Sequence, residues 1–270
     1  MTEVQSGLEG VVAFATEIAE PDKEGGALRY RGVDIEDLVG KVPFGKVWGL
    51  LVDGTFEPGL MPAEPHALMV RSGDPRVDVQ AGLAMLAPEW GMGQLLDISD
   101  EQARLDLARS SVMALSFVAQ SARGLGQPWV PQSTIDSGKT IAERFLLRWR
   151  GEADPAHVKA IDAYWISAAE HGMNASTFTA RVVASTGADC AAALSSAVGA
   201  LSGLKTGVEA AVDEQAPDLP ERHLPDQVLD VDPAVAQGAA FLVGLGDLCG
   251  EGDDAFQAGL DLGHVRLLAS

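Results

Sequence analysis

The sequence predicts a mainly α-helical protein with a small β element near its start and a tail that does not share the fold. Apolar residues recur at helical spacing over most of residues 44–201, which indicates a series of amphipathic helices. Short segments before residue 34 favour extended structure instead. The composition then changes after Gly203. Leu204–Ser270 holds thirteen acidic and three basic residues, which is half of the formal net charge of −20.

The β element is expected in two pieces. Gly10–Glu20 alternates apolar and polar residues and indicates a strand or hairpin arm. Residues 21–26 have the composition of a turn, and Leu28–Gly32 is a second extended piece. Asp34 can then cap a short helix that closes at Gly40, because an aspartate accepts from free N–H groups and a glycine tolerates a left-handed backbone.

Helices are expected to make up the remainder of residues 1–203. Asp154 can cap the helix that begins at Pro155. The last expected helix is rich in Ala and Ser and contains Gly199, so a second helix can approach it closely. This composition fits a buried core helix or a helix at a subunit interface. In chain order the expected helices are Phe44–Val52, Pro75–Ala87, Asp100–Ala122, Thr134–Arg150, Pro155–Ala169, Thr177–Ser185 and Ala188–Leu201.

Composition argues against several classes of function. A net charge of −20 repels phosphate backbones and anionic lipid, so we expect no nucleic-acid or membrane partner. No apolar run approaches the roughly 20 residues that a spanning helix needs, and the first ten residues lack signal-peptide features. Cys190 and Cys249 are too far apart in sequence to indicate a disulfide framework or a metal cluster. We therefore expect a cytoplasmic protein without a metal site.

One short segment carries candidate binding chemistry. His171, Asn174 and Ser176 lie between two helical patterns, so their side chains should be close together. An imidazole, a carboxamide and a hydroxyl could together bind a small dicarboxylate or keto acid. A histidine beside Glu170 also fits a structural, hydrogen-bonded role, and the residues alone leave both interpretations open.

Three motifs occur in the same order as in a known enzyme family: Leu8–Val12 with Leu28–Glu36, then His171–Val182, then Gly187–Asp189 with Gly199–Gly203. Together they resemble the citrate synthase family. The resemblance extends from Met1 to Gly203 and is closest to the citrate synthase 2 type of actinobacteria. It implies an all-α dimeric fold with a large and a small domain, and the condensation of acetyl-CoA with oxaloacetate to citrate and CoA. By this resemblance His171 and Asn174 are substrate-binding residues that contact oxaloacetate, and acetyl-CoA is a substrate, with no further cofactor.

The catalytic part of the family pattern does not follow. In the family, Leu-Ser-Gly runs into Pro-Leu-His-Gly-Gly, whose His helps to form the enol of acetyl-CoA, whereas here Leu204–Val208 contains no His. The later aspartate base and the arginines that hold the dicarboxylate are also missing, and neither His223 nor His264 has a matching context. We therefore expect no catalytic residue in this chain, and only weak binding of oxaloacetate.

The possible codons of the tail, residues 204–270, suggest how this segment originated. When residues are paired so that their numbers sum to 265, Met1 faces His264, and ATG is the reverse complement of CAT. Every pair from there to Gly54 and Ala211 admits complementary codons, and only two of the next six pairs do not. We infer that residues 204–270 are an antisense copy of residues 1–60, which would not be selected to fold.

These observations lead to two main hypotheses. Residues 1–203 are the N-terminal part of a citrate synthase-like domain, and the chain is truncated and inactive. Alternatively, the chain is a non-catalytic interaction module that pairs with an intact citrate synthase subunit, or forms a homodimer. A third and less favoured hypothesis is a shortened acyltransferase with a new mechanism. In the absence of the family's later helices, the apolar faces of Asp100–Ala122 and Ala188–Leu201 should be exposed.

Overall fold

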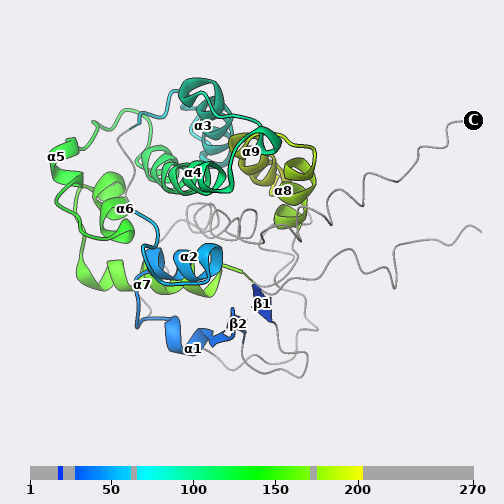
Figure 1. Cartoon of the computed structure of the whole chain (residues 1–270). Helices are drawn as coiled ribbons and strands as arrows, with labels where there is room; N and C mark the ends of the chain where they lie inside the picture. Colours follow the sequence, from blue (N-terminus) through cyan, green and yellow to red (C-terminus); the bar gives the residue numbers. More distant parts are fainter. Residues whose placement is uncertain (1–17, 21–27, 62–65, 171–174, 203–270) are drawn as a thin grey trace, which may run out of the picture.

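The protein is mainly α-helical, as the sequence predicts. A computed structural model describes residues 18–20, 28–61, 66–170 and 175–202 (Figure 1). Strands β1 (Ala19–Glu20), β2 (Arg29–Tyr30) and β3 (Val33–Asp34) form an antiparallel sheet in that order. The part of the expected strand that precedes Ile18 lies outside the described residues.

The described helices follow the predicted order. Helix α4 begins and ends where the pattern predicts, and a short 3₁₀ turn, η1 (Leu95–Asp97), was not expected. The α-helices are α1 (Ile35–Leu38), α2 (Phe44–Asp53), α3 (Pro75–Trp90), α4 (Asp100–Ala122), α5 (Gln132–Ile135), α6 (Ile141–Arg150), α7 (Pro155–Ser167), α8 (Ala175–Ser185) and α9 (Cys190–Ala200).

Predicted caps account for two helix starts. The carboxylate of Asp34 accepts from the backbone N–H of Glu36, and Asp154 accepts from the first N–H groups of α7. Gly54 ends α2 in a left-handed conformation with φ of 69°, which a glycine adopts without steric cost.

Two predictions were wrong by more than the one or two residues by which other helix ends differ. The expected single helix Thr134–Arg150 is divided into α5 and α6, because Thr140 and Glu143 form a capping box that starts a new helix. Helix α3 continues past Ala87 to Trp90, although Pro88 lacks a backbone donor. Pro88 lies in the last turn of α3, so the loss of its backbone hydrogen bond affects only the end of the helix.

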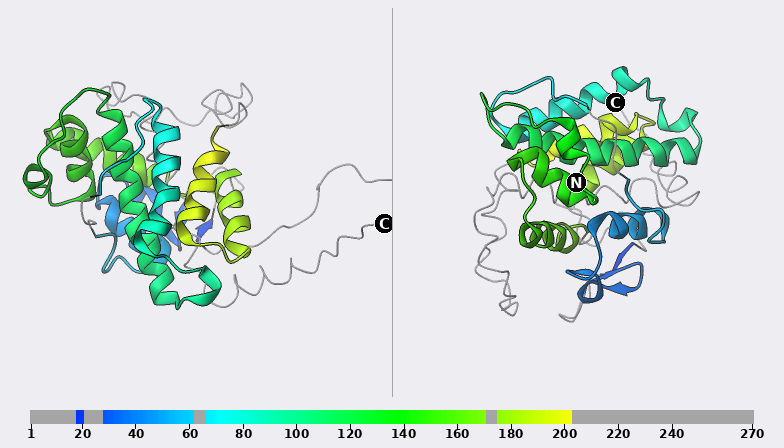
Figure 2. Two further views of the ribbon diagram at one scale, coloured as in Figure 1. Left: turned by 90° about the horizontal axis from the view of Figure 1, so that it is seen from above. Right: turned by 90° about the vertical axis from the view of Figure 1, so that its left-hand side faces the viewer.

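The helices pack in two groups that α6 connects (Figures 1 and 2). Helix α3 packs against α4 and α9, and α9 also packs against α8. In the second group α2 and α1 contact α7, with the small sheet beside them, while α6 contacts α4, α2 and α7. One hydrophobic cluster extends through both groups, from Ile18 to Val198.

The expected exposure of two apolar faces was wrong for the described residues. On α4 the apolar side chains from Val112 to Val118 are at most 9% exposed, and on α9 Leu194, Ala197 and Val198 are at most 4% exposed. Neighbouring helices of the same chain cover these faces, with α3, α6 and α9 against α4 and with α3 and α8 against α9. The interpretation of α9 as a core helix therefore agrees with its burial.

Candidate functional site

The candidate substrate-binding segment lies between α7 and α8. His171 and Asn174, the two predicted oxaloacetate ligands, are outside the described residues, so their role stays a prediction. The flanking residues are described. Glu170 is 1% exposed on the α7 side, and Ser176 is 5% exposed in the first turn of α8. Both of these flanking residues are therefore buried.

A tyrosine of the small sheet fastens the residues just before His171. The hydroxyl of Tyr30 donates to the backbone carbonyl of Ile166 at 2.8 Å and accepts from the backbone N–H of Glu170 at 3.2 Å. All of these groups are buried, and Tyr30 is 0% exposed. One side chain therefore satisfies two backbone groups at the end of α7, where intrahelical partners run out. The β element thereby positions the end of α7 that leads into the candidate site.

Helix α7 is itself anchored to α2 and α6. Asp162 accepts from the backbone N–H of Phe44 at 2.9 Å, and the ring of Trp165 makes edge contacts with Phe44 and Phe145 at centroid distances of 5.3 and 5.2 Å. Burial raises the pKa of Asp162 to about 6, although the hydrogen bond from Phe44 acts in the opposite direction. The element that leads into the site is consequently held by packing on both sides.

Helix α8 has a buried face and an exposed face. Ser176, Thr177 and Ala180 are buried, whereas Phe178 and Val182 are 43% and 46% exposed. Ser176, expected beside His171 and Asn174, is therefore turned toward the protein interior. The exposed pair lies four residues apart and forms a small apolar ridge on one side of the helix.

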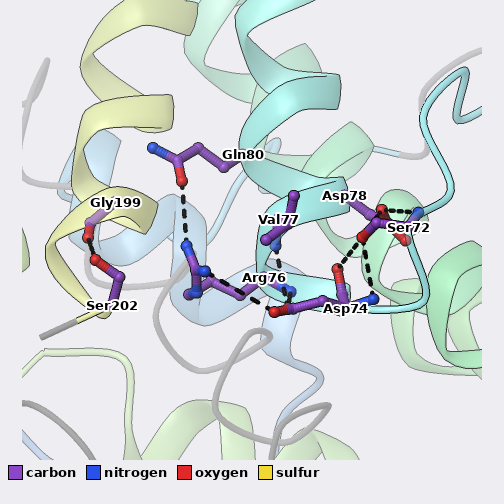
Figure 3. A network of polar contacts seen from close by, with 8 residues as sticks. All are labelled: Ser72, Asp74, Arg76, Val77, Asp78, Gln80, Gly199 and Ser202. Carbon is purple, nitrogen blue, oxygen red and sulfur yellow. Dashed lines mark hydrogen bonds and ion pairs between the residues drawn. The ribbon is translucent and has the colours of Figure 1, made fainter. Parts of the chain in front are cut away.

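Helix α9 ends just before Leu204, where the sequence is predicted to depart from the family pattern. Ser195 donates to the backbone carbonyl of Gln80 on α3 at 2.9 Å, and a Cβ at Gly199 would lie 2.7 Å from Nε2 of Gln80. Figure 3 shows Gln80 on the side of α3 that faces Gly199 and Ser202, with Arg76 donating to its side-chain oxygen at 3.4 Å. The helix that precedes Leu204 is thus held closely against α3.

Sequence reasoning missed the two anchors of α7. Tyr30 was quoted only as part of a motif, and Asp162 was given no role. A lone acidic residue within the apolar stretch Ile161–Ile166 was the available signal for Asp162. For Tyr30 no local signal exists, because both of its partners lie more than 130 residues away.

The described residues offer neither a cluster of metal ligands nor a membrane-spanning helix. Within the described ranges, His, Cys, Asp and Glu side chains nowhere form a group of three or more that could hold a metal ion. In that part of the chain, no helix combines the length and apolar character needed to cross a bilayer.

Comparison with known proteins identifies the family. The family described as "Citrate synthase, C-terminal domain" matches residues 7–216. The chain belongs to the citrate synthase family. The match continues past Gly203, the boundary that the sequence predicts, and that boundary stays a prediction.

Citrate synthase relatives match over part of their length. "Putative citrate synthase 2" of Mycobacterium tuberculosis H37Rv is 73% identical over 198 residues, which are 73% of this chain and 53% of the relative. A citrate synthase of Mycolicibacterium smegmatis is 32% identical over 223 residues, covering 74% and 57%. A 2-methylcitrate synthase 2 of Corynebacterium glutamicum is 30% identical over 233 residues, covering 75% and 58%. The chain thus spans about half the length of the curated relatives it matches.

Solved citrate synthases share the fold. The enzyme from Thermotoga maritima superposes with a TM-score of 0.56 at 24% identity, covering 74% of this chain and 56% of that chain. The enzyme from Thermoplasma acidophilum, solved as a ternary complex with carboxymethyl coenzyme A and oxaloacetate, gives 0.56 at 21% identity, covering 73% and 55%. These likenesses confirm that the chain has a citrate synthase fold, partial relative to the full enzymes.

Proposed function

We propose that this chain carries the front part of a citrate synthase-type oxaloacetate site and does not itself catalyse the condensation. One observation carries this proposal. The family resemblance reaches the helix that leads to the catalytic histidine, and the sequence then reads Leu204–Val208 without a histidine. We also infer that the chain acts in the cytoplasm, because its two cysteines are far apart in sequence and do not indicate a disulfide framework.

The chemistry explains why a partial site should not turn over. Condensation requires a base that removes a weakly acidic methyl proton, together with donors that stabilise the resulting enolate. His171 and Asn174 are proposed to contact oxaloacetate only, so neither activates acetyl-CoA. Losing both the base and the enolate donors should cost many orders of magnitude in rate.

A thiol-release assay with the purified chain, acetyl-CoA and oxaloacetate tests turnover. We expect none above the background of the His171→Ala variant. Turnover that disappears in His171→Ala would overturn the proposal. Calorimetry with oxaloacetate tests binding separately, and we expect an affinity weaker than micromolar that falls further in His171→Ala. An unchanged affinity in that variant would remove His171 from the site.

A chimera distinguishes a missing part from a damaged one. Residues 1–203 joined to the C-terminal portion of the M. tuberculosis relative should regain turnover, because the front part is 73% identical to that relative. A folded chimera without activity would place the defect within residues 1–203. The wild-type relative, assayed in parallel, supplies the reference rate.

The packed core supports a second candidate function. Since the described residues form one hydrophobic cluster from Ile18 to Val198, the front part can present a folded surface without catalysing a reaction. The chain could then pair with an intact citrate synthase subunit, or with itself. Co-expression with a tagged intact relative tests this: co-purification in a fixed ratio supports pairing, and separate elution in size-exclusion chromatography contradicts it.

A further inference from the structure

A small cavity of about 20 Å³ lies between α4 and α6. Its described lining residues belong to these two helices, and none of them comes from α7 or α8. Leu115, Ile141 and Phe145 supply apolar walls, and each is at most 7% exposed. Three polar side chains complete it: Ser116 from α4, and Arg144 and Arg148 from successive turns of α6.

Each polar side chain described in the cavity lining can donate a hydrogen bond. The hydroxyl oxygen of Ser116 accepts from Nε2 of Gln120 at 3.0 Å, which leaves its hydrogen to be donated. Arg144 donates to the backbone carbonyl of Gly138 at 2.9 Å and to Asp136 at 3.1 Å, so most of its five N–H groups remain unused. No carboxylate or amide oxygen belongs to a side chain of the cavity lining.

Arg148 lacks a compensating charge. Within the described residues its guanidinium forms no hydrogen bond and no ion pair, although it is partly buried. Burial, and after it the nearby charge of Arg144, lowers the pKa of Arg148, and only Asp136 acts in the opposite direction. Asp136 already binds Arg144 and accepts from Gln132 at 2.9 Å. A partly desolvated cation without a partner costs free energy that a bound anion would offset.

We propose that this cavity binds a small oxyanion, a carboxylate or a phosphate group, with Arg148 as its main ligand. Arg144 and Ser116 would supply the further donors. A cavity of 20 Å³ holds little more than one water-sized group, so one or two oxygen atoms enter and the remainder of the ligand lies at the mouth. The apolar walls shield these donors from water on one side and thereby strengthen each charged hydrogen bond.

Calorimetry on the full chain tests the proposal with two probes, inorganic phosphate and malonate, each against sodium chloride at matched ionic strength. Arg148→Met keeps the length and apolar stem of the side chain and removes its charge. Arg150→Met is the matched control, since Arg150 is on the same helix, is exposed and does not line the cavity. We expect at least one probe to bind at one site, about tenfold more weakly in Arg148→Met and within about twofold of wild type in Arg150→Met.

Thermal unfolding provides a second readout, and its first comparison needs no ligand. Without an anion, Arg148→Met should melt at a higher temperature than wild type, because an uncompensated charge has been removed. With a probe that binds, wild type and Arg150→Met should gain more stability than Arg148→Met. Ser116→Ala, which also removes a donor from the cavity, decides the question if Arg148→Met fails to fold, and its binding should be weaker than that of wild type.

The outcomes are distinct. Binding of phosphate alone, or of malonate alone, supports the site and identifies the class of oxyanion. Equal binding by wild type and Arg148→Met would overturn the proposal. So would a chloride titration that reproduces the effect, or no binding of either probe by wild type.

Discussion

Asp162 on α7 accepts a hydrogen bond from the backbone N–H of Phe44 at 2.9 Å, across 118 residues of sequence. Phe44 is the first residue of α2, and Pro43, which precedes it, provides no side-chain cap. Asp162 therefore caps α2 from a distant helix and joins the front of the chain to the helix that leads into the candidate site.

This contact predicts a pH dependence of stability. Burial raises the pKa of Asp162 from its ordinary 3.8 to about 6, so the folded state binds this proton more tightly than the unfolded state does. The contribution of this group to stability is therefore largest at low pH and falls as the pH rises through about 6. Asp162→Asn keeps an acceptor for Phe44 and removes the titration.

Chemical unfolding at pH about 4.5 and about 7.5 should show wild type losing on the order of 2 kcal/mol more than Asp162→Asn over this interval. Asp154→Asn is the control, since Asp154 caps α7 from an exposed position and asparagine also caps well. Its pH dependence should match that of wild type. Equal pH dependence in Asp162→Asn and wild type would contradict the prediction.

The two hydrogen bonds of Tyr30 predict a loss of stability in Tyr30→Phe. The variant leaves the buried N–H of Glu170 and the carbonyl of Ile166 without this hydroxyl, which should cost about 1–3 kcal/mol in urea unfolding. Tyr164→Phe is the control. Among the described residues the hydroxyl of Tyr164 forms no hydrogen bond, so the change should stay within about 0.5 kcal/mol of wild type. Similar losses in both variants would mean that the Tyr30 bridge does not stabilise the fold.

Two helical glycines should respond differently to alanine. A Cβ at Gly49 on α2 would lie 2.8 Å from the Cα of Gly59 and 2.9 Å from the carbonyl oxygen of Thr55, and these backbone atoms cannot move aside. The three atoms nearest to a Cβ at Gly199 would all belong to the flexible side chain of Gln80.

Since alanine favours a helix over glycine by about 1 kcal/mol, Gly199→Ala should be near neutral or stabilising. The clash at Gly49 exceeds that gain, and Gly49→Ala should lose about 2–3 kcal/mol of unfolding free energy. Melting curves of both variants check the order. A Gly49→Ala protein as stable as Gly199→Ala would show that the approach of residues 55–59 to α2 is looser than described.

The proposal that residues 204–270 do not form a folded domain predicts where proteases act. Pro217, Pro220 and Pro225 interrupt this part of the sequence, and a sequence not selected for packing supplies no consistent core. Limited proteolysis should therefore cut first between Gly203 and Pro233. Cleavage within α4 before any cleavage of the tail, or slow amide exchange across residues 213–232, would contradict it.

Much of the helical framework was predictable, because its signals are local. The cap residues Asp34 and Asp154 accept from N–H groups two or three residues away, so their roles follow from the adjoining sequence. The same reasoning missed the break between α5 and α6. The capping box of Thr140 and Glu143 was present in the sequence, but the apolar periodicity on both sides suggested one continuous helix.

The burial of α4 differs from the expectation that was based on the missing helices of the family. The absence of the family's later helices suggested an exposed apolar face, yet α3, α6 and α9 cover it. A helix can bury its apolar side chains against whichever neighbours the chain supplies, and the sequence of one helix does not specify which neighbours those are.

The sequence by itself determined the positions of most helices and the family, and it predicts that the family pattern ends near Leu204. Each of these rests on periodicity, caps or motifs that extend over a few neighbouring residues. Only the tertiary structure decided that Tyr30 and Asp162 hold α7, and that Arg144, Arg148 and Ser116 share one cavity. The physical reason is that these groups meet only when helices far apart in sequence pack together. Buried polar groups must then be paired with the partners that this packing places beside them.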